Sequence, residues 1–117
     1  FHLQGVHFEN EVPVQLENRY VNPRMAPDFM AQDFTREQPS AYLVRNVQFD
    51  QMEHVVDAVL PTAEQARWLQ MPPEQPCLVL TRRTWLRGTP VTWVQCVHPG
   101  MRYRLGSRFR TESVHEM

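Results

Sequence analysis

The sequence predicts an α+β domain in which an antiparallel sheet has its helices packed to one side. Residues 77–105 contain two apolar, β-branched and aromatic runs around a Gly-containing turn, which is typical of a β-hairpin. The segments before this hairpin follow the order strand, strand, helix, helix, strand, helix. With 117 residues, the chain has the length of one domain with a single core.

Residues 1–8 and 12–21 are predicted to form the first pair of strands, connected through residues 9–11. Apolar and polar side chains alternate along the second strand, as expected for a strand with one buried side. Its polar side carries Glu17 and Arg19, a carboxylate and a guanidinium two residues apart. From the residues alone, a ligand-binding pair and a plain surface pair worth well under about 1 kcal/mol are both open.

Two short helices are predicted after Asn22-Pro23, because proline cannot extend the strand. The first covers residues 27–34, whose proline suits a first turn and whose aromatic residues are spaced to cover a core. The second covers residues 41–47 and is capped by Ser40. Such a helix start leaves backbone N–H groups pointing outward, which is a ready site for a carboxylate.

The pattern of residues 52–60 is ambiguous between helix and strand, and its valines and the following proline favour a strand. Thr62 is predicted to cap the next helix, residues 63–71, with Gln65 completing a capping box. Beyond the hairpin the composition becomes polar, and residues 111–117 are predicted to be a tail or a final strand edge.

The residues that close the hairpin turn determine which side chains lie on the same side of the hairpin. If Arg87 and Pro90 close the turn, one side is mostly apolar, with Arg82 and Gln95 as exceptions. The other side mixes a cation, an indole, a hydroxyl, a thiol and an imidazole: Arg83, Trp85, Thr92, Cys96 and His98. Such a mixture suits a small polar ligand, and an ordinary solvated face is the alternative.

Composition and charge exclude several classes of function. The net charge of -1 creates no strong field for nucleic acid or an anionic membrane, so any DNA contact requires another domain. No segment approaches the length of a membrane span, and nothing near Phe1 resembles a signal peptide. We therefore expect a cytoplasmic protein without a membrane partner.

Catalytic and metal-binding motifs are absent from the sequence. The five histidines lack ligand spacing, and no CxxC, GxSxG, P-loop or GxGxxG motif occurs, so we expect no metal and no cofactor. Cys77 and Cys96 do not face each other in the hairpin, so no disulfide is expected. Cys96 and His98 lie about 7 Å apart along one strand, too far for direct proton transfer. The residues therefore favour a binding domain without catalytic residues over an enzyme.

Six segments spread over nearly the whole chain resemble, in consistent order, the effector-binding (UTRA) domain of GntR-type transcription repressors, nearest to the histidine utilisation branch. They are EVPVQLENRYVNP, APDFMAQDF, SAYLV, MEHVVDAVLP, EQPCLVLTRRTW and PGMRYRLGSRF. The resemblance implies a chorismate-lyase-like α+β fold and makes residues 1–117 a UTRA domain truncated at its N-terminal side. It also implies a homodimer that contacts operator DNA only through a winged helix-turn-helix domain absent from this chain.

The same resemblance implies candidate site residues. The pattern P-hydrophobic-x-x-E is met by PVQLE, which supplies Glu17, and the serine that opens a helix before Tyr-Leu corresponds to Ser40. Relatives that bind amino sugars have Glu and Tyr where this chain has Thr92 and His98. They also have an arginine ten residues before the pocket Glu, where this chain has His7. These departures point away from sugars, and whether His7 shares a side with Glu17 depends on the turn between the strands.

The histidine utilisation branch implies urocanate as the effector, a planar imidazole joined to an acrylate carboxylate. Glu17 can accept a hydrogen bond from the imidazole, while Arg19, Arg83 or the N–H groups beyond Ser40 can bind the carboxylate. Aromatic residues can stack on the conjugated system, the candidates being Tyr42, Trp85 and Trp93. The predicted ligand-binding residues are Glu17, Arg19, Ser40, Tyr42, Arg83, Thr92, His98 and His7.

Two alternative functions stay open. Chorismate lyases share the implied fold, and fold does not fix function, so a chorismate-lyase-like enzyme is the first alternative, although we find no residue for turnover. The second is a dimerisation module without a ligand, in which exposed strand edges pair between chains.

Overall fold

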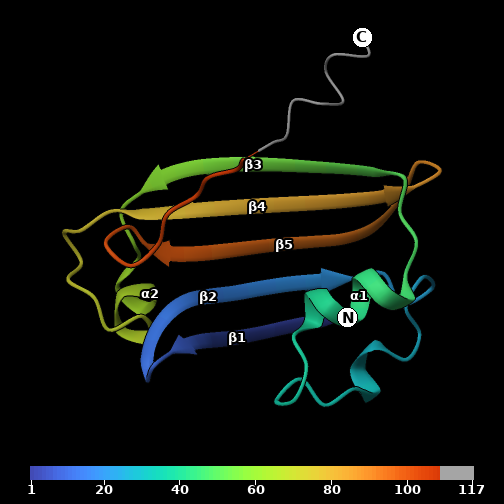
Figure 1. Cartoon of the computed structure of the whole chain (residues 1–117), viewed down its shortest axis with the longest axis horizontal. Helices are drawn as coiled ribbons and strands as arrows, with labels where there is room; N and C mark the ends of the chain where they lie inside the picture. Colours follow the sequence, from blue (N-terminus) through green and yellow to red (C-terminus); the bar gives the residue numbers. More distant parts are fainter. Residues whose placement is uncertain (109–117) are drawn as a thin grey trace, which may run out of the picture.

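The computed structural model describes residues 1–108, which form a five-stranded antiparallel sheet with two helices (Figure 1). The strands are β1 (His2–Glu9), β2 (Val12–Val21), β3 (Gln51–Val59), β4 (Cys77–Leu86) and β5 (Thr89–Pro99), in the spatial order β1-β2-β5-β4-β3. The helices are α1 (Pro39–Asn46) and α2 (Ala63–Trp68), with a 3-10 turn, η1 (Phe29–Ala31). The predicted α+β class and antiparallel sheet are confirmed. None of the helices within residues 1–108 has the length and apolar character needed to cross a membrane.

Local sequence signals place most elements correctly. The strands predicted at residues 1–8, 12–21 and 52–60 correspond to β1, β2 and β3. The capping box of α2 is present, because Thr62 Oγ1 accepts the Gln65 backbone N–H at 3.1 Å and Gln65 Oε1 accepts the Thr62 N–H at 3.0 Å. The prediction for residues 111–117 lies outside the described residues.

Two helix predictions need correction. The helix expected over residues 27–34 is only the single turn η1, since the backbone is already extended at Gln32. The helix α1 begins at Pro39, and its capping position is Gln38, whose side chain makes no capping hydrogen bond. Proline suits the first helical position because its φ is fixed and it has no N–H to satisfy. Ser40 therefore lies in the first turn of α1 instead of capping it.

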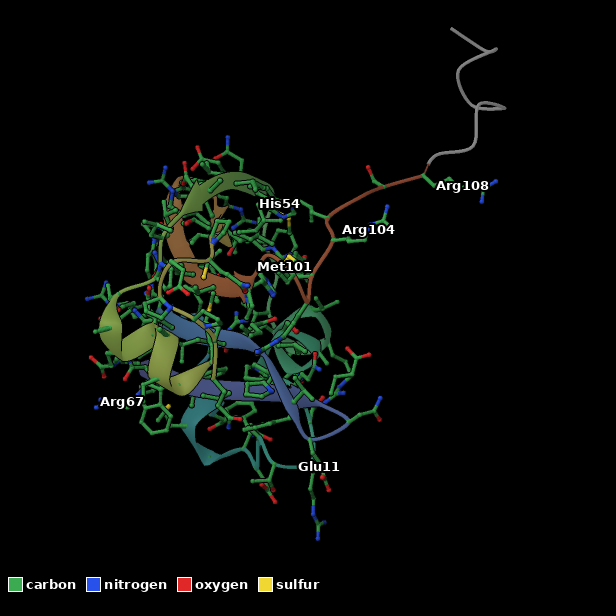
Figure 2. All side chains as sticks on the ribbon, turned by 90° about the vertical axis from the view of Figure 1, so that its left-hand side faces the viewer. Glu11, His54, Arg67, Met101, Arg104 and Arg108 are labelled. Carbon is green, nitrogen blue, oxygen red and sulfur yellow. The ribbon has the colours of Figure 1, made fainter. Side chains whose placement is uncertain are left out.

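The two helices contact opposite faces of the sheet. Helix α1 packs in a cluster with Leu3 and Val21, whereas α2 packs with Leu16, Val79 and Val97. Leu16 and Val21 are five residues apart on β2 and so point to opposite faces. Figure 2 shows Arg67 of α2 on one side of the sheet and the segment leading to Arg104 on the other. The expected placement of the helices on one side is corrected, because both faces carry apolar positions and each requires its own cover. We call these faces the α1 face and the α2 face.

The turn between β4 and β5 lies one residue earlier than the sequence predicted. Arg87 and Gly88 both have positive φ, at 50° and 81°, and Leu86 pairs with Thr89 across this two-residue turn. Such a turn matches the twist of the flanking strands and favours glycine. The pairing then shifts by one residue at Val91, which forms a bulge on β5.

The bulge decides which side chains share a face. Beyond it Thr84 faces Thr92 and Arg82 faces Val94. The predicted pairing of Arg83 with Val94 is wrong by one residue, and a shift of one residue moves a strand's side chains to the other face. Arg82 and Thr84 therefore lie on the α1 face, and Arg83 lies on the α2 face.

Candidate functional site

Buried polar side chains gather on the α1 face. Four of them are at most 5% exposed, and all lie on this face: Glu17, Arg19, Thr84 and His98. Burial of a polar group costs free energy unless hydrogen bonds compensate for lost water, so each of these side chains is expected to have partners. The partners define the chemistry of the face.

Glu17 is the centre of a charged cluster. Its Oε2 accepts a hydrogen bond from Arg19 Nε at 2.9 Å, and its Oε1 accepts one from His7 Nε2 at 3.1 Å. Burial by itself would raise the pKa of the Glu17 carboxyl, but the hydrogen bonds from His7 and Arg19 and the charge of Arg19 hold it below its usual value. The structure thus places His7 on the same face as Glu17, and the carboxylate is ionised at neutral pH.

His98 lies one row further along β5. Glu17 pairs with Cys96, two residues before His98 on the same face. The Nδ1 atom of His98 is 3.2 Å from the Val14 carbonyl oxygen, and the ring of Tyr103 is stacked on the imidazole with centroids 3.6 Å apart. Burial lowers the pKa of His98, and the hydrogen bond to Val14 opposes this shift only in part. The imidazole is therefore neutral at neutral pH.

A small cleft of about 50 Å³ lies between α1 and the sheet, beside the charged cluster. Three predicted residues line it, namely Arg19, Ser40 and Thr92. Two polar residues that the sequence analysis did not select line it as well, Arg82 and Thr84, and six apolar residues complete the lining. Two guanidinium groups and three hydroxyl groups thus surround one cleft, an arrangement suited to binding a carboxylate or another small anion.

Arg82 and Thr84 were missed because of the register error. The Thr84 and Thr92 hydroxyl oxygens are 2.6 Å apart, and Arg82 Nε donates to His54 Nε2 at 2.9 Å. In the predicted register both residues belonged to the apolar side of the hairpin. The signal that was available is Arg82 itself, a cation among the apolar residues of that side.

Two predicted residues lie elsewhere. Tyr42 is in the core cluster under α1, with its ring 6.0 Å from that of Phe29, and it does not line the cleft. Arg83 lies on the α2 face, where its Nε donates to Glu53 Oε1 at 2.9 Å and its guanidinium lies over Trp85. The structure therefore groups Arg19, Ser40 and Thr92 at the cleft and places Glu17, His7 and His98 on the same face in the rows beyond it, without Tyr42 and Arg83.

The arrangement lacks the usual features of a metal site or a nucleophile. Within residues 1–108, no three His, Cys, Asp or Glu side chains are close enough together to hold a metal ion. The Cys96 thiol receives a hydrogen bond from Gln15 Nε2 at 3.3 Å. Burial and then the charge of Glu17 raise the pKa of Cys96 to about 11. A protonated thiol is a poor nucleophile, so Cys96 is not activated for nucleophilic attack at neutral pH.

The sequence was compared with known families and proteins. Residues 1–104 match the model of the UTRA domain. The histidine utilization repressor of Pseudomonas putida is 51% identical over 109 residues, covering 93% of this chain and 44% of that protein. The repressor of the same name from Klebsiella aerogenes is 44% identical, covering 93% of this chain and 45% of that protein. The chain thus spans less than half the length of these curated relatives.

Solved structures agree with this assignment. The C-terminal domain of the histidine utilization repressor from Pseudomonas syringae has a TM-score of 0.87 and 47% identity, covering 94% of this chain and 78% of that one. PhnF from Mycobacterium smegmatis has a TM-score of 0.81 at 18% identity, covering 95% of this chain and 50% of that one, which shows a shared fold. The curated relatives are named as repressors, which supports the prediction of a regulatory domain that is not an enzyme. The chain belongs to the UTRA domain family, in the group that includes the histidine utilization repressors.

Proposed function

We propose that this chain is the effector-sensing domain of a transcription repressor of histidine utilisation genes, and that its effector is urocanate. The observation that carries the proposal is the buried pair of Glu17 and Arg19, bonded to the partly exposed His7, beside the cleft on the α1 face. Urocanate has an imidazole at one end and a carboxylate at the other. The α1 face has groups suited to both ends.

The carboxylate end of urocanate is assigned to the cleft. Arg19 and Arg82 supply positive charge there, and the hydroxyls of Ser40, Thr84 and Thr92 supply further donors. Hydrogen bonds between charged partners contribute about 1.5–3 kcal/mol each. Arg19 is held in place by its bond to Glu17, so little side-chain freedom is lost when the ligand binds.

The imidazole end is assigned to the rows of Glu17 and His98. Each oxygen of Glu17 is bonded to one side chain, Oε1 to His7 and Oε2 to Arg19, so the carboxylate fixes the two groups beside the imidazole end. The row of His98 lies four residues along β5 from the row of Arg19 and Arg82, about 14 Å at roughly 3.4 Å per residue, and the row of Glu17 lies between them. The long arginine side chains shorten this gap, so one small molecule with different groups at its ends can contact both rows.

In the intact repressor, effector binding is proposed to favour one arrangement of a homodimer and so to release operator DNA. DNA contact is assigned to a winged helix-turn-helix domain outside this chain. The chain itself has a net charge of -1 and so lacks the excess positive charge that is typical of nucleic-acid binding. The proposed setting is the cytoplasm, where operator DNA and the metabolite are both found.

The test is calorimetric titration of this chain with urocanate, with histidine and an amino sugar phosphate as controls. We expect saturable binding of urocanate alone, and Glu17→Gln should weaken it at least roughly tenfold, about 1.4 kcal/mol. The matched control is Glu53→Gln, which changes an exposed carboxylate on the α2 face and should leave the affinity unchanged. Equal affinities in both variants would place the binding site elsewhere, and binding of the sugar phosphate instead of urocanate would contradict the assigned effector.

A further inference from the structure

The segment after β5 forms a strap, residues 100–103, that turns back over β5 on the α1 face (Figure 1). The Arg102 backbone N–H donates to the Pro99 carbonyl at 2.9 Å, and the Gly100 N–H donates to the Pro76 carbonyl at 3.0 Å. A Cβ atom on Gly100 would lie 3.0 Å from the Pro76 oxygen, so the close approach favours glycine at this position. The start of the strap is therefore fixed against the loop between α2 and β4.

The side chain of Arg102 holds the strap at three further points. Its Nη1 donates to the carbonyls of Pro13 at 3.0 Å and Leu69 at 2.6 Å, and its Nη2 donates to that of Gln70 at 2.6 Å. These carbonyls belong to the start of β2 and to the residues that end α2. One guanidinium thus joins the strap to both, and it fixes the position of the next residue, Tyr103.

Tyr103 lies flat on His98. The two rings are 3.6 Å apart at their centroids with an interplanar angle of 8°, and His98 is only 4% exposed. This contact prevents the imidazole from turning about its Cβ–Cγ bond without displacing the tyrosine ring. The orientation of the imidazole is therefore set by the strap as well as by its own strand.

The Val14 carbonyl fixes which nitrogen of His98 carries the proton. A carbonyl oxygen only accepts hydrogen bonds, so the Nδ1 atom, 3.2 Å away, must be the donor. A neutral imidazole has a single N–H, and its other nitrogen is then an acceptor. Within residues 1–108 the only hydrogen bond of the His98 ring is that of Nδ1, and Nε2 is not among the fully buried atoms that lack a partner, so it remains accessible to a ligand. His98 thus offers a fixed lone pair one row from Glu17.

We propose that His98 Nε2 accepts a hydrogen bond from a ring N–H of the effector, and that Tyr103 is the positioning residue that keeps this lone pair in place. The inference deepens the proposed function and rests on it. It makes the site selective for molecules that carry an N–H donor at one end and an anionic group at the other. A ligand without the donor leaves a buried acceptor unpaired, which is the kind of mismatch that binding sites reject most strongly.

The role of Tyr103 is tested first without ligand, by ¹⁵N NMR of the histidine rings at neutral pH. We expect the Nδ1–H tautomer of His98 in the wild-type chain and in Tyr103→Phe, and a mixture of tautomers in Tyr103→Leu. The same spectra show whether Tyr103→Leu is folded. A single Nδ1–H tautomer in a folded Tyr103→Leu variant would overturn the positioning role.

The acceptor role is tested by calorimetry with urocanate and with urocanate methylated on a ring nitrogen, which has no N–H when neutral. Wild type should bind urocanate at least roughly tenfold more tightly than the methylated form, or about 1.4 kcal/mol. His98→Ala should bind both ligands alike, which separates loss of the hydrogen bond from simple crowding by the methyl group. A preference that persists in His98→Ala would overturn the proposal.

The strap variants complete the test. Tyr103→Leu should lose about tenfold in urocanate affinity, Tyr103→Phe should stay within about threefold of wild type, and Met101→Ala, an exposed strap residue, should match wild type. Equal binding of urocanate and its methylated form by wild type would refute this inference and leave the proposed function standing. Binding of neither ligand by wild type would refute the proposed function and the acceptor role together, while the tautomer measurement would still decide the role of Tyr103.

Discussion

The two faces of one sheet differ in what they bury. The α2 face packs Leu16, Val79 and Val97 against α2 and the fully buried Leu69, an entirely apolar contact. The α1 face instead buries an ion pair and an imidazole next to its apolar cluster. A buried ion pair adds little net stability, because desolvation offsets most of its attraction. The comparison indicates that the α2 face mainly stabilises the fold, whereas the α1 face holds charged groups in place for another molecule.

Removal of one partner of the buried Glu17–Arg19 pair should cause the largest loss of stability among the variants considered. Arg19→Met leaves the Glu17 carboxylate 3% exposed without its main cation, and we expect a loss of about 3–5 kcal/mol in the free energy of unfolding by urea. The double variant Glu17→Leu/Arg19→Met removes both charges and should recover most of that loss. A single variant that costs under about 1 kcal/mol would show that the pair behaves as a solvated one.

Truncation on the α2 face should affect stability but not binding. Val79→Ala removes about two buried methylene equivalents and leaves a cavity, so we expect a loss of about 2 kcal/mol. The affinity for urocanate at a temperature where the variant is folded should remain within about twofold of wild type. A large loss of affinity would mean that the two faces are not independent.

Neighbouring arginines on β4 offer a matched pair, since Arg82 and Arg83 point to opposite faces. Arg82→Gln should raise the Kd for urocanate at least roughly tenfold, about 1.4 kcal/mol. Arg83→Gln removes only an exposed pair with Glu53 and should change the Kd less than about twofold. Calorimetry measures the Kd of both variants. A larger rise in Kd for Arg83→Gln than for Arg82→Gln would indicate the predicted register instead of the observed one.

The smallest expected effect is on the pH dependence of stability. His98 has a folded pKa below its ordinary 6.5, so its contribution is full above pH 6.5 and is lost as the pH falls through the folded value. Glu17 has a folded pKa below 4.5, so its contribution is lost in the same direction below pH 4.5. Urea midpoints between pH 4 and 8 should fall less steeply below pH 6.5 in His98→Asn. An unchanged slope would mean that His98 titrates alike in both states.

The sequence predicted features that depend on local chemistry. The strand stop at Asn22-Pro23, the alternation along β2 and the capping box at Thr62 each involve residues close in the chain, and these three predictions agree with the structure. The start of α1 was misplaced because Ser40 and Pro39 are both good first-turn residues, and the proline determined the boundary. The side of the sheet that each helix covers was not predictable in the same way, because it depends on packing between distant segments.

The site was predicted only in part, because the residues whose face depends on the β4–β5 register were missed. The resemblance selected Glu17, His7 and His98 by motif, and the structure places them in adjacent rows of one face. Arg82 and Thr84 were missed because a bulge at Val91 leaves no unambiguous signal in the sequence. The link from Arg102 to the end of α2 was equally hidden, since its three acceptors are backbone carbonyls that any residue type supplies.

The bulge at Val91 also bears on how new specificities arise in such domains. Strands β3 and β4 pair without any irregularity. A change in the register between β4 and β5 therefore moves the side chains of both β3 and β4 to the other face of the sheet. A regular ladder that continued from the turn without the bulge would pair Arg83 with Thr92, and it would exchange Arg82 and His54 on the α1 face for Arg83 and Glu53, a swap of imidazole for carboxylate. The bulge, as well as the residue types, therefore decides which side chains a ligand on this face meets. Alignments of related domains across this hairpin should follow strand register before residue identity.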